Sequence, residues 1–169
     1  MCPKNALTVP GFTKEEIIKQ LKVITDKKKE SPLIVTFLCN WCSYLGADLA
    51  GTSKIQYPTN TRPIHVMCTA MIDPALVFEA LFNGADGVLI AGCHPQDCHY
   101  KTGFIKAENR YESIISMLEE LKINNNRVKI ISISAGEGQK FANAIKEFTE
   151  TLKTLGSISK DLKNVKEYE

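Results

Sequence analysis

The sequence lacks any apolar run long enough to cross a bilayer, and its beginning, MCPKNALTVPGFTKEE, lacks the apolar core of a signal peptide. We therefore expect a cytoplasmic protein that does not enter a membrane. The 21 basic and 19 acidic residues are spread along the chain and nearly cancel, giving a formal charge of +2. A concentrated basic stripe, which nucleic-acid-binding proteins use to contact phosphates, is absent, so nucleic acid is not an expected partner.

Internal repeats and low-complexity tracts are also absent from the 169 residues. A chain of this length is typical of one domain and can bury a sufficient apolar core without covalent staples. The six cysteines are therefore not needed as disulfides. Thiols stay reduced in the cytoplasm, so clustered cysteines indicate metal ligands or reactive groups.

Apolar and β-branched runs predict four strands, at residues 33–39, 63–68, 87–93 and 127–135. Helical patterns lie before, between and after them, at residues 13–29, 44–52, 74–83, about 107–122 and 136–156. Alternating strands and helices imply a parallel sheet with right-handed crossovers. We expect an α/β fold with a flavodoxin-like, doubly wound parallel sheet of about four strands in the order 2-1-3-4, plus an N-terminal helix.

Capping residues mark the ends of two of these helices. Thr13 and Glu16 are spaced as a capping box at the start of the N-terminal helix. Asp73 followed by Pro74 is typical of a helix start, and Gly84 is a suitable stop for the same helix.

We divide the chain into three parts. Residues 1–30 form a leader with the N-terminal helix, residues 31–156 form the α/β domain, and residues 157–169 form a tail. The tail is polar and charged, so we expect it to be loosely attached or used against a partner.

Cysteines recur at the carboxyl ends of the predicted strands. Cys39, Cys68 and Cys93 each end one strand, while two more follow in the next loops, Cys42 and Cys98. Parallel strands share one carboxyl edge, where open α/β sheets bind their ligands, so all five should meet there. A single cysteine is usually only a small buried residue, but five at one edge indicate a site. The sixth, Cys2, lies far away in the leader and is expected to take no part.

The spacing of these cysteines favours a metal. Cys39 and Cys42 form a C-x-x-C pair that can chelate one ion, and Cys93 and Cys98 can do the same through a wider loop. Four thiolates suit either tetrahedral zinc or a 2Fe-2S cluster, and the spacing does not separate the two. We favour these two pairs as metal ligands, with Cys68 as the additional cysteine at the site.

Other kinds of site explain the sequence less well. A thioredoxin-type dithiol needs only CNWC and leaves the other cysteines unexplained. A Rieske centre would need His94 and His99 as ligands, but each directly follows a candidate cysteine, which would strain chelation. We expect these histidines to hydrogen-bond around the site or to face solvent, and His65 to be structural. A flavin or nucleotide site lacks a glycine-rich phosphate loop after the first strand, where the first cysteine pair lies instead.

Four segments closely resemble one known family. They are FLCNWCSYLGADLAGTSKIQYP, VMCTAMIDP, GADGVLIAGCHPQDCHYKTGF and SISAGEGQKFANAIKEF. Together they resemble the methyl-viologen-reducing hydrogenase delta subunit family over most of the chain, from about residue 33 to residue 156.

The resemblance implies a function. Members of that family carry a single 2Fe-2S cluster, have no catalytic activity alone, and pass electrons between a hydrogenase or formate dehydrogenase and the flavin subunit of heterodisulfide reductase in methanogens and related anaerobes. We therefore expect an electron-transfer subunit of a flavin-based electron-bifurcating complex. The alternative is a zinc-stabilised interaction module that uses the same thiolates without a redox role.

Overall fold

The computed structural model describes residues 9–26 and 32–165, so Cys2 and the rest of residues 1–8 lie outside the described part of the chain. Four strands are present: β1 (Ile34–Cys39), β2 (Thr61–Val66), β3 (Gly87–Gly92) and β4 (Val128–Ser132). Six α-helices accompany them: α1 (Lys14–Asp26), α2 (Ser43–Thr52), α3 (Pro74–Phe82), α4 (Gly103–Glu120), α5 (Gly138–Leu155) and α6 (Ser159–Val165). Three short 3-10 turns complete the elements: η1 (Thr69–Met71), η2 (Pro95–Asp97) and η3 (Asn125–Arg127).

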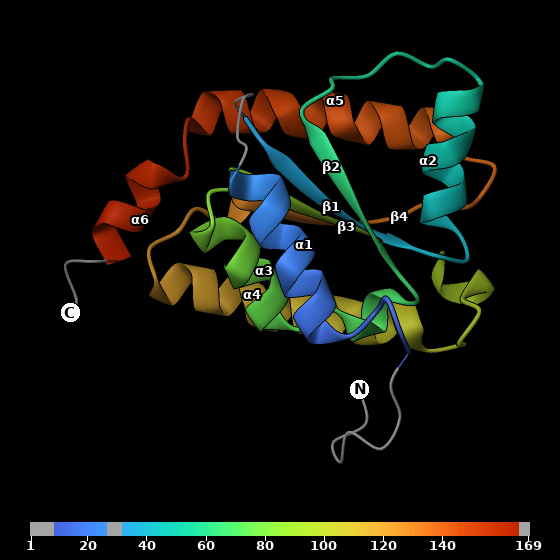
Figure 1. Cartoon of the computed structure of the whole chain (residues 1–169), viewed down its shortest axis with the longest axis horizontal. Helices are drawn as coiled ribbons and strands as arrows, with labels where there is room; N and C mark the ends of the chain where they lie inside the picture. Colours follow the sequence, from blue (N-terminus) through green and yellow to red (C-terminus); the bar gives the residue numbers. More distant parts are fainter. Residues whose placement is uncertain (1–8, 27–31, 166–169) are drawn as a thin grey trace.

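The strands form one sheet in the order β2-β1-β3-β4, and every neighbouring pair is parallel (Figure 1). The expected α/β class, strand order and N-terminal helix are confirmed. In the register of the sheet, Cys39 at the end of β1 lies opposite Val66 of β2, and Leu38 lies opposite Ala91 of β3. The carboxyl ends of these three strands are therefore level with one another.

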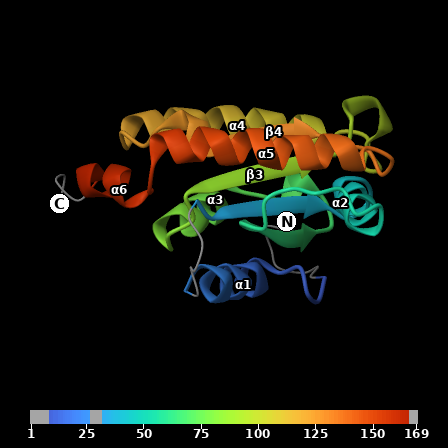
Figure 2. The same cartoon turned by 90° about the horizontal axis from the view of Figure 1, so that it is seen from above.

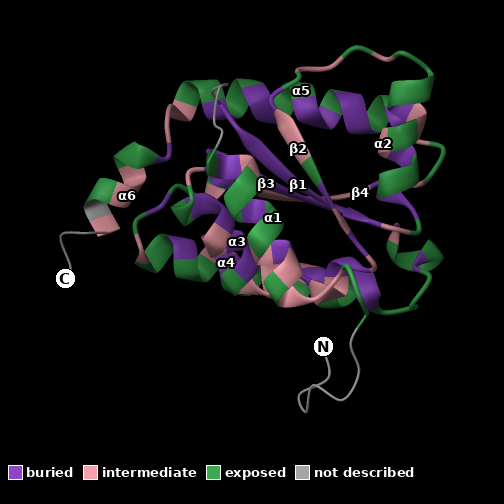
Figure 3. Cartoon of the chain, viewed as in Figure 1, coloured by how far each residue is buried: buried purple, intermediate pink, exposed green. Residues whose placement is uncertain are grey.

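Helices cover both faces of the sheet. One face packs against α1, α3 and α4, and the other packs against α2 and α5 (Figures 1 and 2). Alternate residues of β1 enter the two cores: Val35 and Phe37 face the first, and Ile34 and Leu38 face the second. All positions of β1 and β3 are buried, which explains their continuous apolar sequences, and the exposed residues lie on the outer sides of the helices (Figure 3).

The expected helix caps are present. Thr13 and Glu16 form the reciprocal capping box: the Thr13 N–H donates to a Glu16 carboxylate oxygen at 3.0 Å, and the Glu16 N–H donates to Thr13 Oγ1 at 3.3 Å. Asp73 Oδ1 accepts a hydrogen bond from the Leu76 N–H at 3.1 Å and so caps α3. Gly84, with φ of +103°, follows the end of this helix in a conformation that favours glycine.

The second strand begins and ends two residues earlier than the sequence predicts. The strand β2 ends at Val66, two residues before Cys68. The chain leaves the sheet there because η1 closes a tight turn, in which the Met71 N–H donates to the Cys68 carbonyl at 2.9 Å. As a result Cys68 begins a turn and does not end a strand.

Residues 157–165 are attached to the domain, in contrast to the loosely attached tail that we expected. Ile158 is buried, and its N–H donates to Asp86 Oδ1 at 2.9 Å. Asp161 of α6 accepts two hydrogen bonds from the guanidinium of Arg127, at 2.8 and 3.0 Å. Arg127 is almost completely buried, and it also donates to the carbonyls of Asp86 and Gly156. This network anchors α6 at the amino-terminal edge of the sheet.

Replacing Asp161 by alanine should destabilise the protein strongly, because it leaves the buried Arg127 guanidinium without its carboxylate. We expect the free energy of unfolding in urea to fall by about 3 kcal/mol. Lys163→Ala on the exposed side of the same helix is the control and should have little effect. Equal unfolding midpoints for the two variants would show that this ion pair does not anchor α6.

Candidate metal centre

All five candidate cysteines meet at the carboxyl edge of the sheet, and all five are buried. They come from three strand ends and the loops that follow, as the sequence predicts: Cys39 ends β1, Cys42 precedes α2, Cys68 precedes η1, Cys93 follows β3 and Cys98 follows η2. The parallel sheet therefore brings together thiols that are up to 59 residues apart in the chain.

Three of these thiols form a compact group. The sulfurs of Cys39, Cys42 and Cys93 all lie within 4.8 Å of one another. Cys42 Sγ is 2.9 Å from Cys93 Sγ, and Cys39 Sγ is 3.7 Å from Cys93 Sγ. A metal bound by thiolates lies about 2.3 Å from each sulfur, so sulfurs at these separations can share one ion.

The other two thiols meet at the start of α4. A Cβ atom on Gly103 would lie 2.6 Å from Cys68 Sγ and 3.1 Å from Cys98 Sγ, so both sulfurs pack against the bare Cα of this glycine. The thiol of Cys39 lies near enough to Cys68 to raise the pKa of Cys68. Cys98 also packs in the same buried cluster as Cys39, Cys42 and Cys93.

A buried serine fixes the distance between two of the strand ends. Ser43 Oγ accepts a hydrogen bond from the Cys39 N–H at 2.8 Å and donates to the Ala91 carbonyl at 2.5 Å. It thus links the end of β1 to the end of β3, just before Cys93. Neither Ser43 nor Gly103 was among the predicted site residues, although a serine directly after C-x-x-C and a glycine shortly after the last cysteine were visible in the sequence.

Burial and mutual hydrogen bonds raise the pKa values of three of the thiols, those of Cys39, Cys68 and Cys93. Burial raises the pKa of Cys93 to about 11. The hydrogen bond with Cys42 raises the pKa of Cys39, and the hydrogen bond with Cys39, together with burial, raises the pKa of Cys68. Only a cation can compensate several thiolates at such distances, so metal binding here must release protons.

The histidines lie around the cysteines and not among them. His94 Nε2 bonds to Glu137 at 2.7 Å, and the Ser134 N–H donates to the same carboxylate at 2.7 Å. These two hydrogen bonds, the one from Ser134 first, lower the pKa of Glu137 to about 2. His65 bonds to Asn40 at 2.8 Å. In the part of the chain that the structure describes, the group able to hold a metal contains cysteines alone, which argues against a Rieske centre.

Aromatic side chains from the turns that carry Cys42 and Cys98 contact one another. Trp41 of the CNWC turn stacks on His99, with ring centroids 3.8 Å apart and planes 13° apart. Its indole N–H donates to the Tyr100 hydroxyl at 3.3 Å. Trp41 and Tyr100 both remain more than 40% exposed, so this aromatic group lies on the surface.

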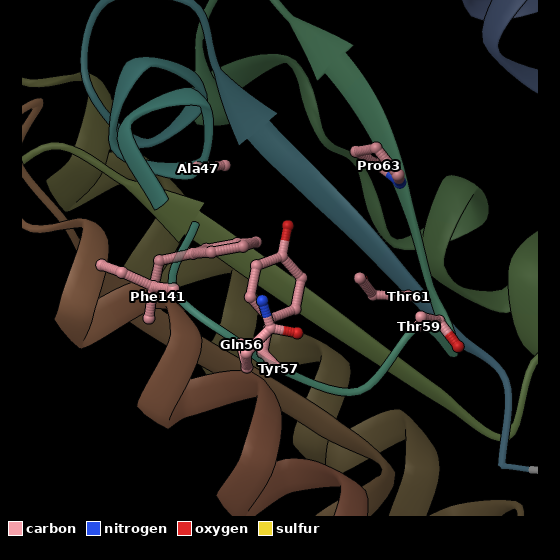
Figure 4. Close-up of a pocket in the computed structure, with 8 residues that line it drawn as sticks. Ala47, Gln56, Tyr57, Thr59, Thr61, Pro63 and Phe141 are labelled. Carbon is pink, nitrogen blue, oxygen red and sulfur yellow. The ribbon is translucent and has the colours of Figure 1, made fainter. Parts of the chain in front are cut away.

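A separate cavity of about 340 Å³ lies between α2, α5 and the start of β2 (Figure 4). Its wall includes Tyr57, Thr61, Pro63 and Phe141. None of the residues that line it is a cysteine, a histidine or a charged residue.

Over residues 9–26 and 32–165, none of the helices has both the length and the apolar character needed to span a bilayer.

Comparison with protein families gives a direct match. The model of the family described as methyl-viologen-reducing hydrogenase, delta subunit, matches residues 34–156, which include all five buried cysteines. The N-terminal helix α1 and the C-terminal helix α6 lie outside this match.

Named relatives fall into two groups, a long one and a short one. The chain is 44% identical to a subunit of the ferredoxin:CoB-CoM heterodisulfide reductase of Methanosarcina mazei, which we call the long reductase subunit. The match covers 94% of this chain but only 20% of the long reductase subunit. It is 47% identical to the iron-sulfur subunit of the F420-non-reducing hydrogenase vhc of Methanococcus voltae, over 74% of this chain and 87% of that protein. The corresponding iron-sulfur subunit of Archaeoglobus profundus is 45% identical over 74% of this chain and 91% of its own length. The chain thus spans about a fifth of the long reductase subunit and nearly all of the two hydrogenase iron-sulfur subunits.

Gly103→Ala should disturb the cysteine cluster, because the new methyl group must displace the sulfur of Cys68 or Cys98. We expect the free energy of unfolding of the metal-free, reduced protein to fall by about 1–3 kcal/mol. Gly51→Ala is the matched control, since no atom lies within 4 Å of its added Cβ. Within a helix, alanine is more favourable than glycine by about 1 kcal/mol, so this variant should be more stable than the wild type. The two variants should therefore shift the urea midpoint in opposite directions, and a shift in the same direction would contradict the packing at Gly103.

Proposed function

The chain belongs to the methyl-viologen-reducing hydrogenase delta subunit family, and from this premise we propose that it is an electron-transfer subunit carrying one 2Fe-2S cluster. In our proposal it relays electrons between a hydrogenase or a formate dehydrogenase and the flavin subunit of heterodisulfide reductase. The relay would form part of a cytoplasmic, flavin-based electron-bifurcating complex.

The observation that carries this proposal is the convergence of five buried thiols from three strand ends. The group of Cys39, Cys42 and Cys93 supplies three ligands at separations that suit a metal centre. We propose Cys98 as the fourth ligand, since it packs in the same buried cluster as the other three, and Cys68 as the neighbouring cysteine. The names of the two hydrogenase iron-sulfur subunits support a cluster of iron and sulfide over a single zinc ion.

A bound 2Fe-2S cluster would supply transfer of one electron at a time. The role of the chain is to hold the ligands and to control their surroundings. Ser43 fixes the ends of β1 and β3 relative to each other, and Gly103 makes room for two sulfurs. Backbone N–H groups of the CNWC and CHPQDC turns would stabilise the negative charge of bound sulfur, which raises a reduction potential, while burial of the ligands lowers it.

The named relatives are subunits of hydrogenase and heterodisulfide reductase, which is consistent with a role inside an oxidoreductase complex. We propose that this chain has no catalytic activity alone. We propose that electrons enter and leave through the exposed edge that carries Trp41 and Tyr100, because these residues belong to the same turns as the buried Cys42 and Cys98.

Metal content and spectra of protein purified without oxygen test the proposal. We expect about two irons and two sulfides per chain, a visible absorption, and an electron paramagnetic resonance signal that appears on one-electron reduction. A colourless protein with one zinc per chain and no iron would contradict it. In that case the same thiolates would form a structural zinc site of an interaction module.

A series of single Cys→Ser variants tests the ligand set. The variants at Cys39, Cys42, Cys93 and Cys98 should lose most of the iron, because each removes one thiolate ligand. Cys68→Ser should retain about two irons per chain and a similar spectrum, and so serves as the matched control. If Cys68→Ser loses iron and Cys98→Ser retains it, then Cys68 is the fourth ligand and Cys98 is the neighbouring cysteine.

A further inference from the structure

The strand β4 is an edge strand, because it pairs with β3 on one side and with no other strand in the described part of the chain. The Ile133 N–H donates to the last carbonyl of β3 at 2.8 Å. Since backbone groups alternate in direction along a strand, Val128, Ile130 and Ser132 direct their N–H and C=O groups away from β3. The Tyr111 hydroxyl donates to the Val128 carbonyl at 3.1 Å, which agrees with this direction. Ile130, in the middle of the strand, therefore presents an N–H and a carbonyl to any strand that lies beside β4.

The opposite edge strand, β2, is protected against such pairing. Pro63 lies in the middle of β2 and has no N–H, which is a usual way to block an exposed edge. The helix α1 lies on the β2 side of the sheet, whereas α4 and α5 lie on the β4 side (Figure 2). The strand β4 contains no proline, and its two apolar side chains Ile130 and Ile131 are only half-buried. An apolar edge strand of this kind is suited to pairing with a further strand.

A hollow of about 470 Å³, which we call the β4 hollow, lies between β4 and α5. Its walls include Lys129 from the strand, and Lys140 and Glu147 from the helix. Lys129 pairs with Glu147 at 3.6 Å, and Lys140 pairs with Glu137 at 3.5 Å. Both ion pairs are long and largely exposed, so each stabilises the chain little and can exchange its partner at a small cost. The hollow therefore offers both a positive and a negative charge to a neighbouring molecule.

The charges around the β4 hollow complement themselves under a two-fold rotation. The helix α5 follows β4 in the chain and runs back along it, so Lys129 near the start of the strand meets Glu147, whereas Lys140 lies toward the end of the strand. The middle of the strand, at Ile130, is thus level with the part of α5 between Lys140 and Glu147. If a second copy pairs antiparallel with β4 about an axis at Ile130, the two α5 helices also run antiparallel. Lys140 of each copy then faces Glu147 of the other.

We propose that two copies of this chain associate through β4, which pairs antiparallel with β4 of the second copy about a two-fold axis at Ile130. The Ile130 N–H of each copy donates to the Ile130 carbonyl of the other, and the two sheets become one continuous sheet. The half-buried side chains of Ile130 and Ile131 are covered by this contact, which adds apolar burial to the hydrogen bonds. The inference goes beyond the electron relay and does not depend on which metal the cysteines bind, because β4 carries none of them.

Sedimentation of the full chain, purified with its metal and without oxygen, tests the association over a range of protein concentrations. We expect a reversible dimer. Lys140→Glu should weaken the dimer about ten-fold at low salt, because both contacts with Glu147 of the other copy become repulsive. The double variant Lys140→Glu/Glu147→Lys should recover most of the lost affinity, since it exchanges the two charges across the interface. Lys146→Glu makes the same charge change on α5 outside the β4 hollow, so it is the matched control and should dimerise like the wild type.

Hydrogen exchange of the backbone amides shows whether β4 is the contact. At concentrations where the wild type is a dimer, exchange of the Ile130 amide should be about ten-fold slower than in the dilute monomer, because the second copy accepts its hydrogen bond. Lys140→Glu at the same concentrations should exchange this amide faster than the wild type does. The Ile133 amide is bonded to β3 in a single copy, so its exchange should change much less and serves as the internal control.

Three results would overturn the inference. A wild type that stays monomeric at every concentration would show that β4 does not pair with itself. Equal dimer affinities for the wild type and Lys140→Glu would place the interface on another surface. If the Ile130 amide becomes protected only when a different protein is added, a strand of that protein and not a second copy pairs with β4. None of these results bears on the relay function, which the iron content and the spectra test separately.

Discussion

Buried thiolates repel one another, and this constraint governs the whole carboxyl edge of the sheet. The sulfurs of Cys39, Cys42 and Cys93 lie within 4.8 Å of one another in a region with little access to water. The pKa values of Cys39 and Cys93 are raised, so these two thiols remain protonated without a cation. The arrangement is therefore one that a metal centre completes, because the cation replaces the protons and removes the repulsion. Ser43 and the other buried contacts hold the ligands together in advance, which lowers the cost of ordering them when metal binds.

The strand order determines which cysteines can meet. Because β1 lies between β2 and β3, the turn after β1 is beside both of the other loops that carry cysteines. The cysteine loops are also brought together because the three strands end at the same level. Cys39 lies opposite Val66 on one side, and Leu38 lies opposite Ala91 on the other. An order that separated β1 from β3 would divide the compact sulfur group. The fourth strand carries no cysteine, and its loop contributes Ser134 and Glu137, which hold His94 beside the site.

Local sequence signals predicted most of the fold. Continuous apolar runs identified β1 and β3, and the capping residues Thr13 and Asp73 identified two helix starts, because these features depend on neighbours in the chain. The same reasoning placed the five cysteines at one edge. Contacts between distant residues were not predictable in this way. Ile158 appeared to belong to a loose tail, but Asp86, which is 72 residues earlier, binds its N–H, and nothing near Ile158 in the sequence indicates that partner. Gly103 was missed for the same reason, since its role depends on two sulfurs from other loops.

The two edges of the sheet differ in a way that suits a relay. At the amino-terminal edge, the buried Arg127 joins Asp161, Asp86 and Gly156, so that edge is closed by polar contacts within the chain. At the carboxyl edge the sulfurs are buried, whereas Trp41 and Tyr100 in the same turns are largely exposed. A redox group bound by these cysteines would therefore be shielded from water while neighbouring side chains of the same turns remain available to a docked protein. Because the opposite edge is fixed by contacts within the chain, a partner could bind at the carboxyl edge without disturbing it.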